Sequence, residues 1–144
     1  MGENIMSLSK RALPCLLIVA FILVGVFSLS STKAFAMSSK GSPEIAFHTD
    51  ANTYTKTATT IDVYGICNSN GVSVQLYKKG NNNAIRIVDV YKGMTYNKSL
   101  GAFTYKTSIS LKGLSAGQYD VCVYGYWSWK DYRAELQHYL TIQR

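Results

Sequence analysis

Charged residues and extended helical periodicity are both scarce in this sequence, and each shortage excludes a class of protein. Only 16% of the 144 residues are charged against 47% hydrophobic, which excludes a disordered polyelectrolyte. No segment of ten or more residues after residue 36 keeps a helical period, so a parallel α/β fold with its crossover helices is excluded. Tyrosine is abundant instead: 11 tyrosines within an aromatic fraction of 12% exclude a coiled coil or a low-complexity spacer.

Residues 1–36 have the pattern of a secretory signal helix. Lys10 and Arg11 form a positive n-region, an almost wholly apolar run covers residues 12–29, and residues 34–36 supply the small-x-small pattern of a signal peptidase site. The run is also about long enough to span a bilayer, so an uncleaved membrane anchor is the alternative. The cleavage pattern favours removal, and the long n-region indicates a Gram-positive bacterium. We therefore predict a secreted or cell-surface protein with no stable membrane span after signal removal.

Removal of the signal would leave a small basic chain of residues 37–144. It would take three basic and one acidic residue from the totals of 15 and 8, so the remaining net charge is +5. The basic residues are scattered, with Lys78-Lys79 as the only adjacent pair after residue 36. Nucleic-acid binding would need a basic stripe, so no nucleic-acid partner is expected.

Alternation of apolar and polar residues, the signature of strands, recurs along the rest of the chain. Residues 37–42 are small and polar and predict a flexible lead-in, followed by one domain over residues 43–144. About seven strands are expected, with Lys130-Asp131 at a hairpin tip. We predict an all-β fold, an antiparallel sandwich of two sheets. The predicted strands cover residues 44–48, 59–66, 72–77, 84–91, 103–111, 119–123 and 134–142.

Residues 111–121 carry a recognisable pattern: a leucine, an Ala-Gly turn and then Tyr-x-Val. Earlier in the chain, a strand ending in Val-Tyr-Gly leads through a turn to Val-Ser-Val-Gln-Leu-Tyr at 72–77. In these patterns residues 59–126 resemble bacterial immunoglobulin-like and fibronectin-III-like modules. The resemblance implies an immunoglobulin-like sandwich in a secreted or surface setting, and it carries no catalytic residues. Tyr119 is expected to anchor the turn before it through its hydroxyl, in the manner of a tyrosine corner.

Two cysteines, Cys67 and Cys122, follow the signal segment. Outside the cell such a pair tends to oxidise, and closing a loop of about 55 residues would stabilise the fold by roughly 4 kcal/mol. Strand alternation argues against a bridge, because Cys67 shares the inward phase of Val63 whereas Cys122 shares the phase of Asp120 and is expected to point outward. The sequence therefore leaves both outcomes open, a disulfide or two separate thiols.

The most distinctive cluster is aromatic and lies near the C-terminus. It consists of Tyr124, Tyr126, Trp127, Trp129 and Tyr132. Alternation predicts that the two tryptophans share one face and that Tyr124 and Tyr126 share the other. Flat aromatic rings stack on sugar rings and dominate protein-binding hot spots, while ordinary cross-strand packing is the alternative. The cluster predicts a site for an extracellular glycan, a wall polymer or a protein partner.

No catalytic or metal-binding constellation stands out. His48 and His138 are the only histidines, no nucleophile elbow or glycine-rich phosphate cradle occurs, and the carboxylates are isolated. We therefore expect no metal, no cofactor and no enzymatic activity, and predict a secreted binding module. The alternative is a membrane-active or toxin-like cationic factor, since positive charge and aromatics suit anionic membrane surfaces. The oligomeric state is left open.

Overall fold

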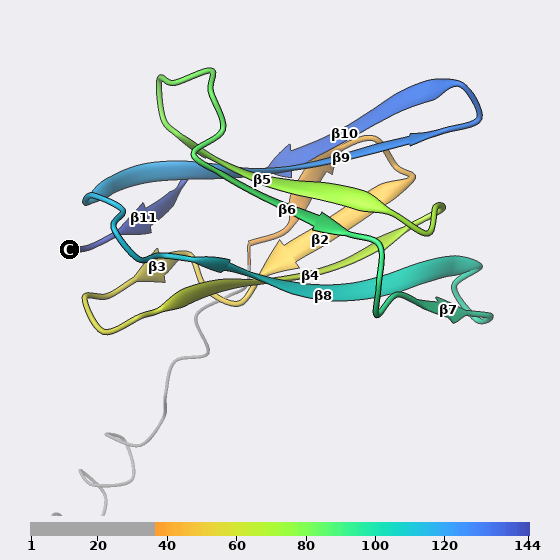
Figure 1. The fold of residues 1–144 in the computed structure, drawn as a ribbon, viewed down its shortest axis with the longest axis horizontal. Helices are drawn as coiled ribbons and strands as arrows, with labels where there is room; N and C mark the ends of the chain where they lie inside the picture. Colours follow the sequence, from red (N-terminus) through yellow and green to blue (C-terminus); the bar gives the residue numbers. More distant parts are fainter. Residues whose placement is uncertain (1–36) are drawn as a thin grey trace, which may run out of the picture. The chain divides into compact units, whose positions relative to one another are not determined.

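The structure is a computed structural model that describes residues 37–144 (Figure 1). The predicted signal segment, residues 1–36, lies outside the described residues. Within them the chain is all-β, as predicted, and forms two sheets. None of the described residues builds a helix with the length and hydropathy that a bilayer crossing requires.

Eleven strands make up this part of the chain. In chain order they are β1 (Ser39–Gly41), β2 (Ile45–Thr49), β3 (Thr53–Tyr54), β4 (Thr60–Cys67), β5 (Val72–Lys78), β6 (Arg86–Val90), β7 (Thr95–Asn97), β8 (Ala102–Ser110), β9 (Gly117–Trp127), β10 (Lys130–Leu136) and β11 (Leu140–Ile142). All seven predicted strands are present. The additional strands are short, and the last predicted strand, 134–142, is divided between β10 and β11.

The strands form a four-stranded and a seven-stranded sheet. The first, which we call the β4 sheet, has the order β2-β4-β8-β7. In the second, the β9 sheet, the long strand β9 pairs with β5 on one edge and with β10 and β11 on the other. Strand β6 continues the sheet beyond β5, β1 lies beyond β10, and β3 lies beyond β11. Every pair is antiparallel except β3–β11, a short parallel contact that the sequence prediction did not include.

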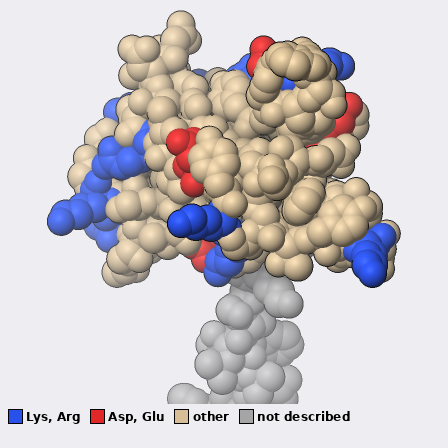
Figure 2. All heavy atoms as spheres, turned by 45° about the vertical axis from the view of Figure 1, so that its right-hand side comes forward, with Lys and Arg blue, Asp and Glu red and all other residues tan. Residues whose placement is uncertain are grey.

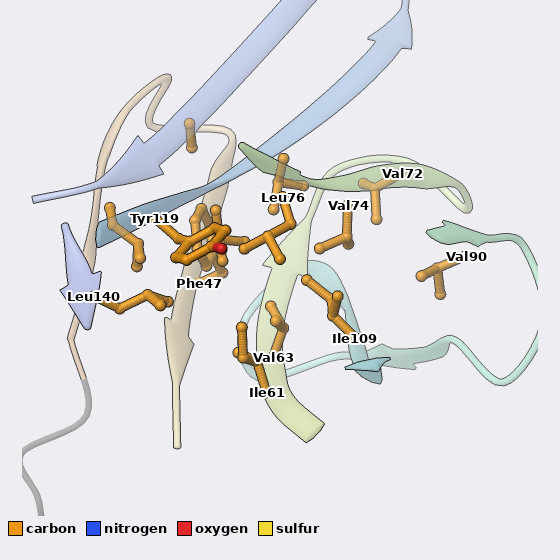
Figure 3. Close-up of a cluster of buried hydrophobic side chains, with 14 of the residues drawn as sticks. Phe47, Ile61, Val63, Val72, Val74, Leu76, Val90, Ile109, Tyr119 and Leu140 are labelled. Carbon is orange, nitrogen blue, oxygen red and sulfur yellow. The ribbon is translucent and has the colours of Figure 1, made fainter. Parts of the chain in front are cut away.

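The hydrophobic core lies between the two sheets. Strand alternation sends Val63 and Ile109 inward from the β4 sheet and Val74 inward from the β9 sheet (Figure 3). Val121 of β9 has the same inward phase, and all four residues are fully buried. Burying this apolar surface on both inner faces is the main term that holds the sheets together. The inward phase predicted for residues 72–77 is correct.

The lead-in predicted over residues 37–42 contains a strand in the structure. Strand β1 pairs with β10, with Ser39 opposite Leu136, and the Gln137 N–H donates to the Ser38 carbonyl at 3.1 Å. The Ser39 hydroxyl also accepts the Phe47 N–H at 2.9 Å. Because these contacts use the backbone and small polar groups, the strand needs no apolar alternation, which is why the sequence pattern missed it.

The predicted role of Tyr119 is correct. Its ring is buried in the core, and its hydroxyl donates to the Ser115 carbonyl at 2.7 Å. This bond fastens the turn between β8 and β9 to the start of β9. The turn thus holds one end of the longest strand, whose opposite end carries the candidate site.

The two cysteines are free in the structure and lie on opposite sides of the β9 sheet. Cys67 points from β4 into the core, where its thiol donates to the Ser69 carbonyl at 2.9 Å. Cys122 has the phase of Asp120 on the outer face of β9 and is nevertheless buried. Of the two outcomes left open by the sequence, the structure has separate thiols, because a sheet lies between the sulfurs.

Candidate functional site

The outer face of the β9 sheet carries most of the unusual side chains. Register places two rows of outward residues across β5, β9 and β10: Ser73, Tyr124 and Arg133, then Gln75, Cys122 and Glu135. Short polar side chains in such rows would normally be solvated. Here a buried thiol, a tyrosine and an ion pair occupy them. The side chains on this face therefore contact one another and are not simply surrounded by solvent.

A hollow of about 650 Å³ opens at one end of this face, and we call it the tyrosine groove. It forms because β5 starts at Val72 while the β9–β10 hairpin continues further, the last β5–β9 pair being Ser73 with Tyr124 (Figure 1). Its size falls within the range of about 300–1,000 Å³ that ligand sites have. The groove is lined by Ser69, Asn70, Gly71, Val72, Ser73, Tyr91, Tyr124, Gly125, Tyr126, Asp131, Tyr132 and Arg133.

Two tyrosine rings of the groove are open to solvent. Tyr91 is 69% exposed and Tyr126 is 59% exposed. The Tyr91 ring lies against the turn between β4 and β5, where a Cβ on Gly71 would come within 2.7 Å of its Cδ1 atom. Gly71 therefore leaves room for the ring in this position. The two rings offer flat apolar surfaces of the kind that stack on a ligand.

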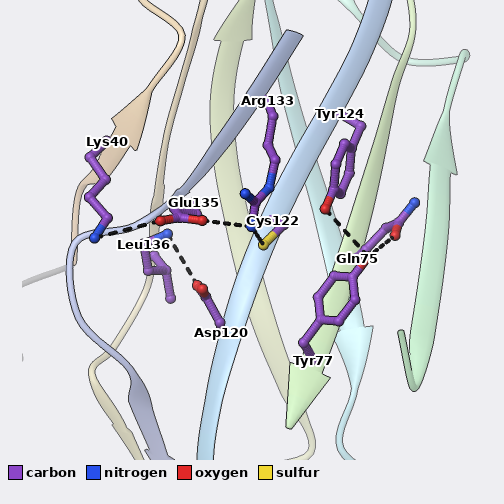
Figure 4. A network of polar contacts seen from close by, with 9 residues as sticks. All are labelled: Lys40, Gln75, Tyr77, Asp120, Cys122, Tyr124, Arg133, Glu135 and Leu136. Atoms are coloured by element: carbon purple, nitrogen blue, oxygen red, sulfur yellow. Dashed lines mark hydrogen bonds and ion pairs between the residues drawn. The ribbon is translucent and has the colours of Figure 1, made fainter. Parts of the chain in front are cut away.

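Arg133 and Tyr124 lie at the inner end of the groove, and we call this pair the ridge. Figure 4 shows the two side chains with the polar contacts around them. The guanidinium lies 5.8 Å from the centroid of the Tyr124 ring and 2.7 Å from the Glu135 carboxylate, and it donates to the Cys122 sulfur at 3.6 Å. Burial raises the pKa of Tyr124 to about 12, so its hydroxyl stays neutral. These contacts fix the direction of a charged side chain that is itself exposed.

A second, more polar hollow of about 420 Å³ lies on the other side of the ridge, and we call it the lysine hollow. It is lined by Tyr77, Lys78, Lys79, Gly80, Asn81, Asn82, Asp120, Cys122, Tyr124, Arg133, Glu135 and Tyr139. Tyr124 and Arg133 line both hollows, so the two adjoin at the ridge.

Three potential metal ligands gather on the floor of the lysine hollow. The ligand atoms of Asp120, Cys122 and Glu135 lie within 4.8 Å of one another. The Arg133 guanidinium already contacts both Cys122 and Glu135, and the Leu136 N–H donates to Asp120 at 3.2 Å. Burial raises the pKa values of Asp120 and Cys122, which also disfavours the charged forms that a metal needs. We assign no ion to this cluster.

Asp120 provides a test of how strongly this face is shielded from solvent. Burial raises its pKa above the ordinary 3.8, so ionising it in the folded state costs stability as pH rises from about 3.8 through the raised value. We expect Asp120→Asn, which can still accept the Leu136 N–H, to be more stable than the parent at pH 7. The advantage should vanish below about pH 3.8, where the parent is neutral too. Thermal unfolding between pH 3 and 8 measures it, with the exposed Asp89→Asn as control, and an equal difference at every pH would contradict it.

The predicted aromatic cluster is divided between two faces and a turn. Trp127 and Tyr132 stack with centroids 3.9 Å apart and pack against the core, on the side opposite Tyr124 and Tyr126. A side chain on Gly125 would overlap the Trp127 ring, so that glycine makes room for the stack. Trp129 is 91% exposed. The structure brings Tyr124 and Tyr126 to the groove face. Tyr132 also contributes to the lining, although its ring is stacked on Trp127 on the other side, and both tryptophans lie outside the lining.

The hairpin tip is Ser128–Trp129 and not the predicted Lys130-Asp131. Strand β9 ends at Trp127 and β10 begins at Lys130, so the two residues between them form the turn. Because Trp129 belongs to this turn, strand alternation does not apply to it, and the prediction that it shares a face with Trp127 is wrong. Both turn residues have positive φ, 51° and 60°, the conformation of a type I′ turn in which Asn-Gly is favoured.

This turn should therefore be strained. A left-handed conformation costs a residue other than glycine about 1–2 kcal/mol. We expect Ser128→Asn combined with Trp129→Gly to raise the free energy of unfolding by about 1 kcal/mol, part of the gain being offset by the entropy that glycine adds to the unfolded chain. Urea unfolding measures this. Trp129→Ala keeps the strain and removes only an exposed ring, so it should leave stability nearly unchanged. Equal stability of the Asn-Gly variant and the parent would show that the turn is relaxed.

Comparison with known proteins assigns the chain neither a family nor a function. No protein-family model, no curated protein and no solved structure matches the chain. No residue role is carried over from another protein, and the site is argued from its own geometry.

Two groups of groove residues were not anticipated from the sequence. Tyr91 follows an ordinary strand pattern, and the 69–71 turn carries only the general signal of an Asn-Gly pair. Both join the hairpin only through the pairing of β5 with β9, whose partners lie 41 to 51 residues apart in the chain. Knowing that pairing would have placed the turn beside Tyr126, since antiparallel partners run in opposite directions.

Proposed function

We propose that this chain is a secreted or cell-surface, non-enzymatic module with an immunoglobulin-like fold that binds an extracellular glycan in the tyrosine groove. The observation that carries the proposal is the pair of exposed rings, Tyr91 and Tyr126, in a hollow that also presents Asn70, Asp131 and Arg133. A sugar ring has an apolar face edged by hydroxyls. Flat rings with polar groups between them complement that pattern.

The immunoglobulin-like assignment draws support from strand order. The order β2-β4-β8-β7 in one sheet and β5-β9-β10 in the other corresponds to the A-B-E-D and C-F-G order of immunoglobulin domains. The hydroxyl bond from Tyr119 to Ser115 matches a tyrosine corner. The secreted setting draws its support from the signal pattern of residues 1–36.

Composition of the groove favours a glycan over a protein partner. Its apolar surface comes mainly from tyrosine rings, and Val72 is the only aliphatic side chain larger than alanine in its lining. Protein-binding hot spots centre on fully desolvated, well-packed pockets. An open groove of hydroxyl-bearing rings is better suited to a ligand that is itself rich in hydroxyls.

The carboxyl groups available in the groove are consistent with binding of a glycan without its hydrolysis. Glycoside hydrolysis uses a pair of carboxyl groups on either side of the bond that breaks. Among the described residues lining the groove, Asp131 is the only carboxylate. The groove therefore offers one of the two groups that such a reaction needs.

A pull-down on polysaccharides tests the proposal. The protein is incubated with cellulose, chitin, xylan, peptidoglycan and polygalacturonate, and with anionic vesicles to test membrane activity. We expect at least one polysaccharide to retain the parent and Tyr96→Ala, a control tyrosine that is 53% exposed on β7, and to release Tyr126→Ala. Retention by no polysaccharide, or equal retention of Tyr126→Ala, would contradict the proposal. Leakage of the vesicles would favour the membrane-active alternative.

A further inference from the structure

The lysine hollow has an unbalanced charge that glycan binding in the groove does not use. We propose that the two hollows form one continuous track and that the ligand is an anionic polymer: it stacks on the tyrosine groove, crosses the Tyr124–Arg133 ridge and places a carboxylate or phosphate beside Lys79, with the charge of Lys78 nearby. This inference rests on the proposed function and names its ligand class.

Continuity of the track follows from the shared ridge. Tyr124 and Arg133 line both hollows, and both lie on the same outward row of the β9 sheet. The Tyr124 hydroxyl lies 3.4 Å from that of Tyr77, which in turn donates to Gln75 at 2.6 Å. The ridge is therefore tied to the sheet by hydrogen bonds and presents ring and guanidinium surfaces to a chain that crosses it (Figure 4).

The acidic groups of the lysine hollow are already engaged. The Glu135 carboxylate lies 2.7 Å from the Arg133 guanidinium and 3.6 Å from the Lys40 ammonium, so two cations face one anion. Asp120 accepts the Leu136 N–H. Neither carboxylate contacts Lys78 or Lys79 in a salt bridge.

The two lysines, in contrast, have only uncharged partners. The Lys78 ammonium donates to the Ser115 hydroxyl at 2.8 Å, and the Lys79 ammonium donates to the Gln118 side-chain carbonyl at 2.8 Å. Lys79 also lies 4.9 Å from the centroid of the Tyr139 ring. The Lys79 ammonium is thereby held at the hollow with its charge unneutralised. Lys78 also belongs to the lining, but it pairs with the inward Tyr119, and its ammonium reaches Ser115 at the edge of the sheet, where it adds a second unneutralised charge. An anion arriving there gains an attraction that no protein carboxylate supplies.

Elsewhere the positive charge is dispersed, which makes this pair distinctive. Figure 2 brings the hairpin end of the domain forward and shows basic groups at several separate places with acidic groups between them. Lys78-Lys79 is the only adjacent basic pair after residue 36. A specific anionic contact, rather than general adsorption to a basic surface, is the expected consequence.

Isothermal titration with three hexameric probes tests this: cellohexaose as neutral chain, hexagalacturonate as carboxylate chain and glycerol phosphate hexamer as phosphate chain. We expect the anionic probe that fits to bind about threefold to tenfold more weakly to Lys78→Gln/Lys79→Gln than to the parent, as one exposed ion pair and a second nearby charge allow. Lys92→Gln/Lys98→Gln, with the same net charge, should bind like the parent. Raising the salt to 1 M should remove the difference between the two proteins, because screening shortens the reach of the charges.

The length of the probe tests whether the track is continuous. A trimer of the same probe should bind at least tenfold more weakly than the hexamer.

The outcomes separate this inference from the proposed function. Binding that is lost in Tyr126→Ala but unchanged in the Lys78→Gln/Lys79→Gln variant overturns the anionic track and leaves the groove as the binding site. Equal affinity for trimer and hexamer overturns the continuous track in the same way. Failure of every probe, with failure of every polysaccharide in the pull-down, overturns the proposed function and this inference with it.

Discussion

Replacing Gly65 by alanine should destabilise the fold by about 3 kcal/mol, as overpacking of a close-packed core does. Gly65 on β4 pairs with Tyr105 on β8, and the buried tyrosine ring lies across the glycine, where a Cβ would overlap it. The ring has little room to move away from the glycine, because it belongs to the close-packed core. An aromatic residue covering a glycine on the neighbouring strand is a known device for closing such a gap.

Chemical denaturation of the parent, Gly65→Ala, Tyr105→Leu and the double variant measures this effect. If the overlap is the cause, the double variant will lose less stability than the sum of the two single losses. The Tyr105 hydroxyl has no hydrogen-bond partner in the described structure, so Tyr105→Phe should be neutral or stabilising. A loss below about 0.5 kcal/mol in Gly65→Ala, the size of an ordinary surface change, would contradict the packing described here.

Removing the exposed rings of the tyrosine groove should have the largest effect on binding. We expect Tyr91→Ala and Tyr126→Ala each to raise Kd about tenfold, the size of a moderate hot-spot loss, and their combination to bring binding near the detection limit. Both rings are mostly exposed, so the melting temperature should hardly change. Titration with the polysaccharide retained in the pull-down provides the measurement.

Tyr96→Ala is the matched control for these variants, because it removes a ring of similar exposure from β7 on the other sheet. It should bind like the parent. If Tyr96→Ala weakened binding as much as Tyr126→Ala, the exposed tyrosines would act as a general adhesive surface and the groove would have no special part.

Strand alternation was a good guide where one face of a strand is buried and the other is not. It located the seven main strands, the inward residues of 72–77 and the opposite phases of Cys67 and Cys122. It failed for β1, which is held by backbone bonds at an edge, and for the hairpin tip, where Ser128 and Trp129 lack the residues typical of a two-residue turn.

The candidate site was harder to predict than the fold because its parts meet through long-range pairing. Tyr124, Tyr126 and Tyr132 were predicted as one cluster with the tryptophans. Only the observed register shows that Tyr124 and Tyr126 face the groove while the Tyr132 ring turns to the other side and stacks on Trp127. Tyr91 and Arg133 carry no local pattern that marks them. Their roles depend on which strands become neighbours, and alternation within one strand does not contain that information.

The central claim, that ligand binds on the tyrosine groove, is tested most directly by NMR of the isotope-labelled protein titrated with the retained polysaccharide. We predict that the backbone signals of Asn70, Tyr91 and Tyr126 shift with ligand concentration, while those of Tyr64 and Lys106 on the outer face of the β4 sheet stay in place. Shifts confined to the β4 sheet, or absent from the groove at saturation, would contradict the account.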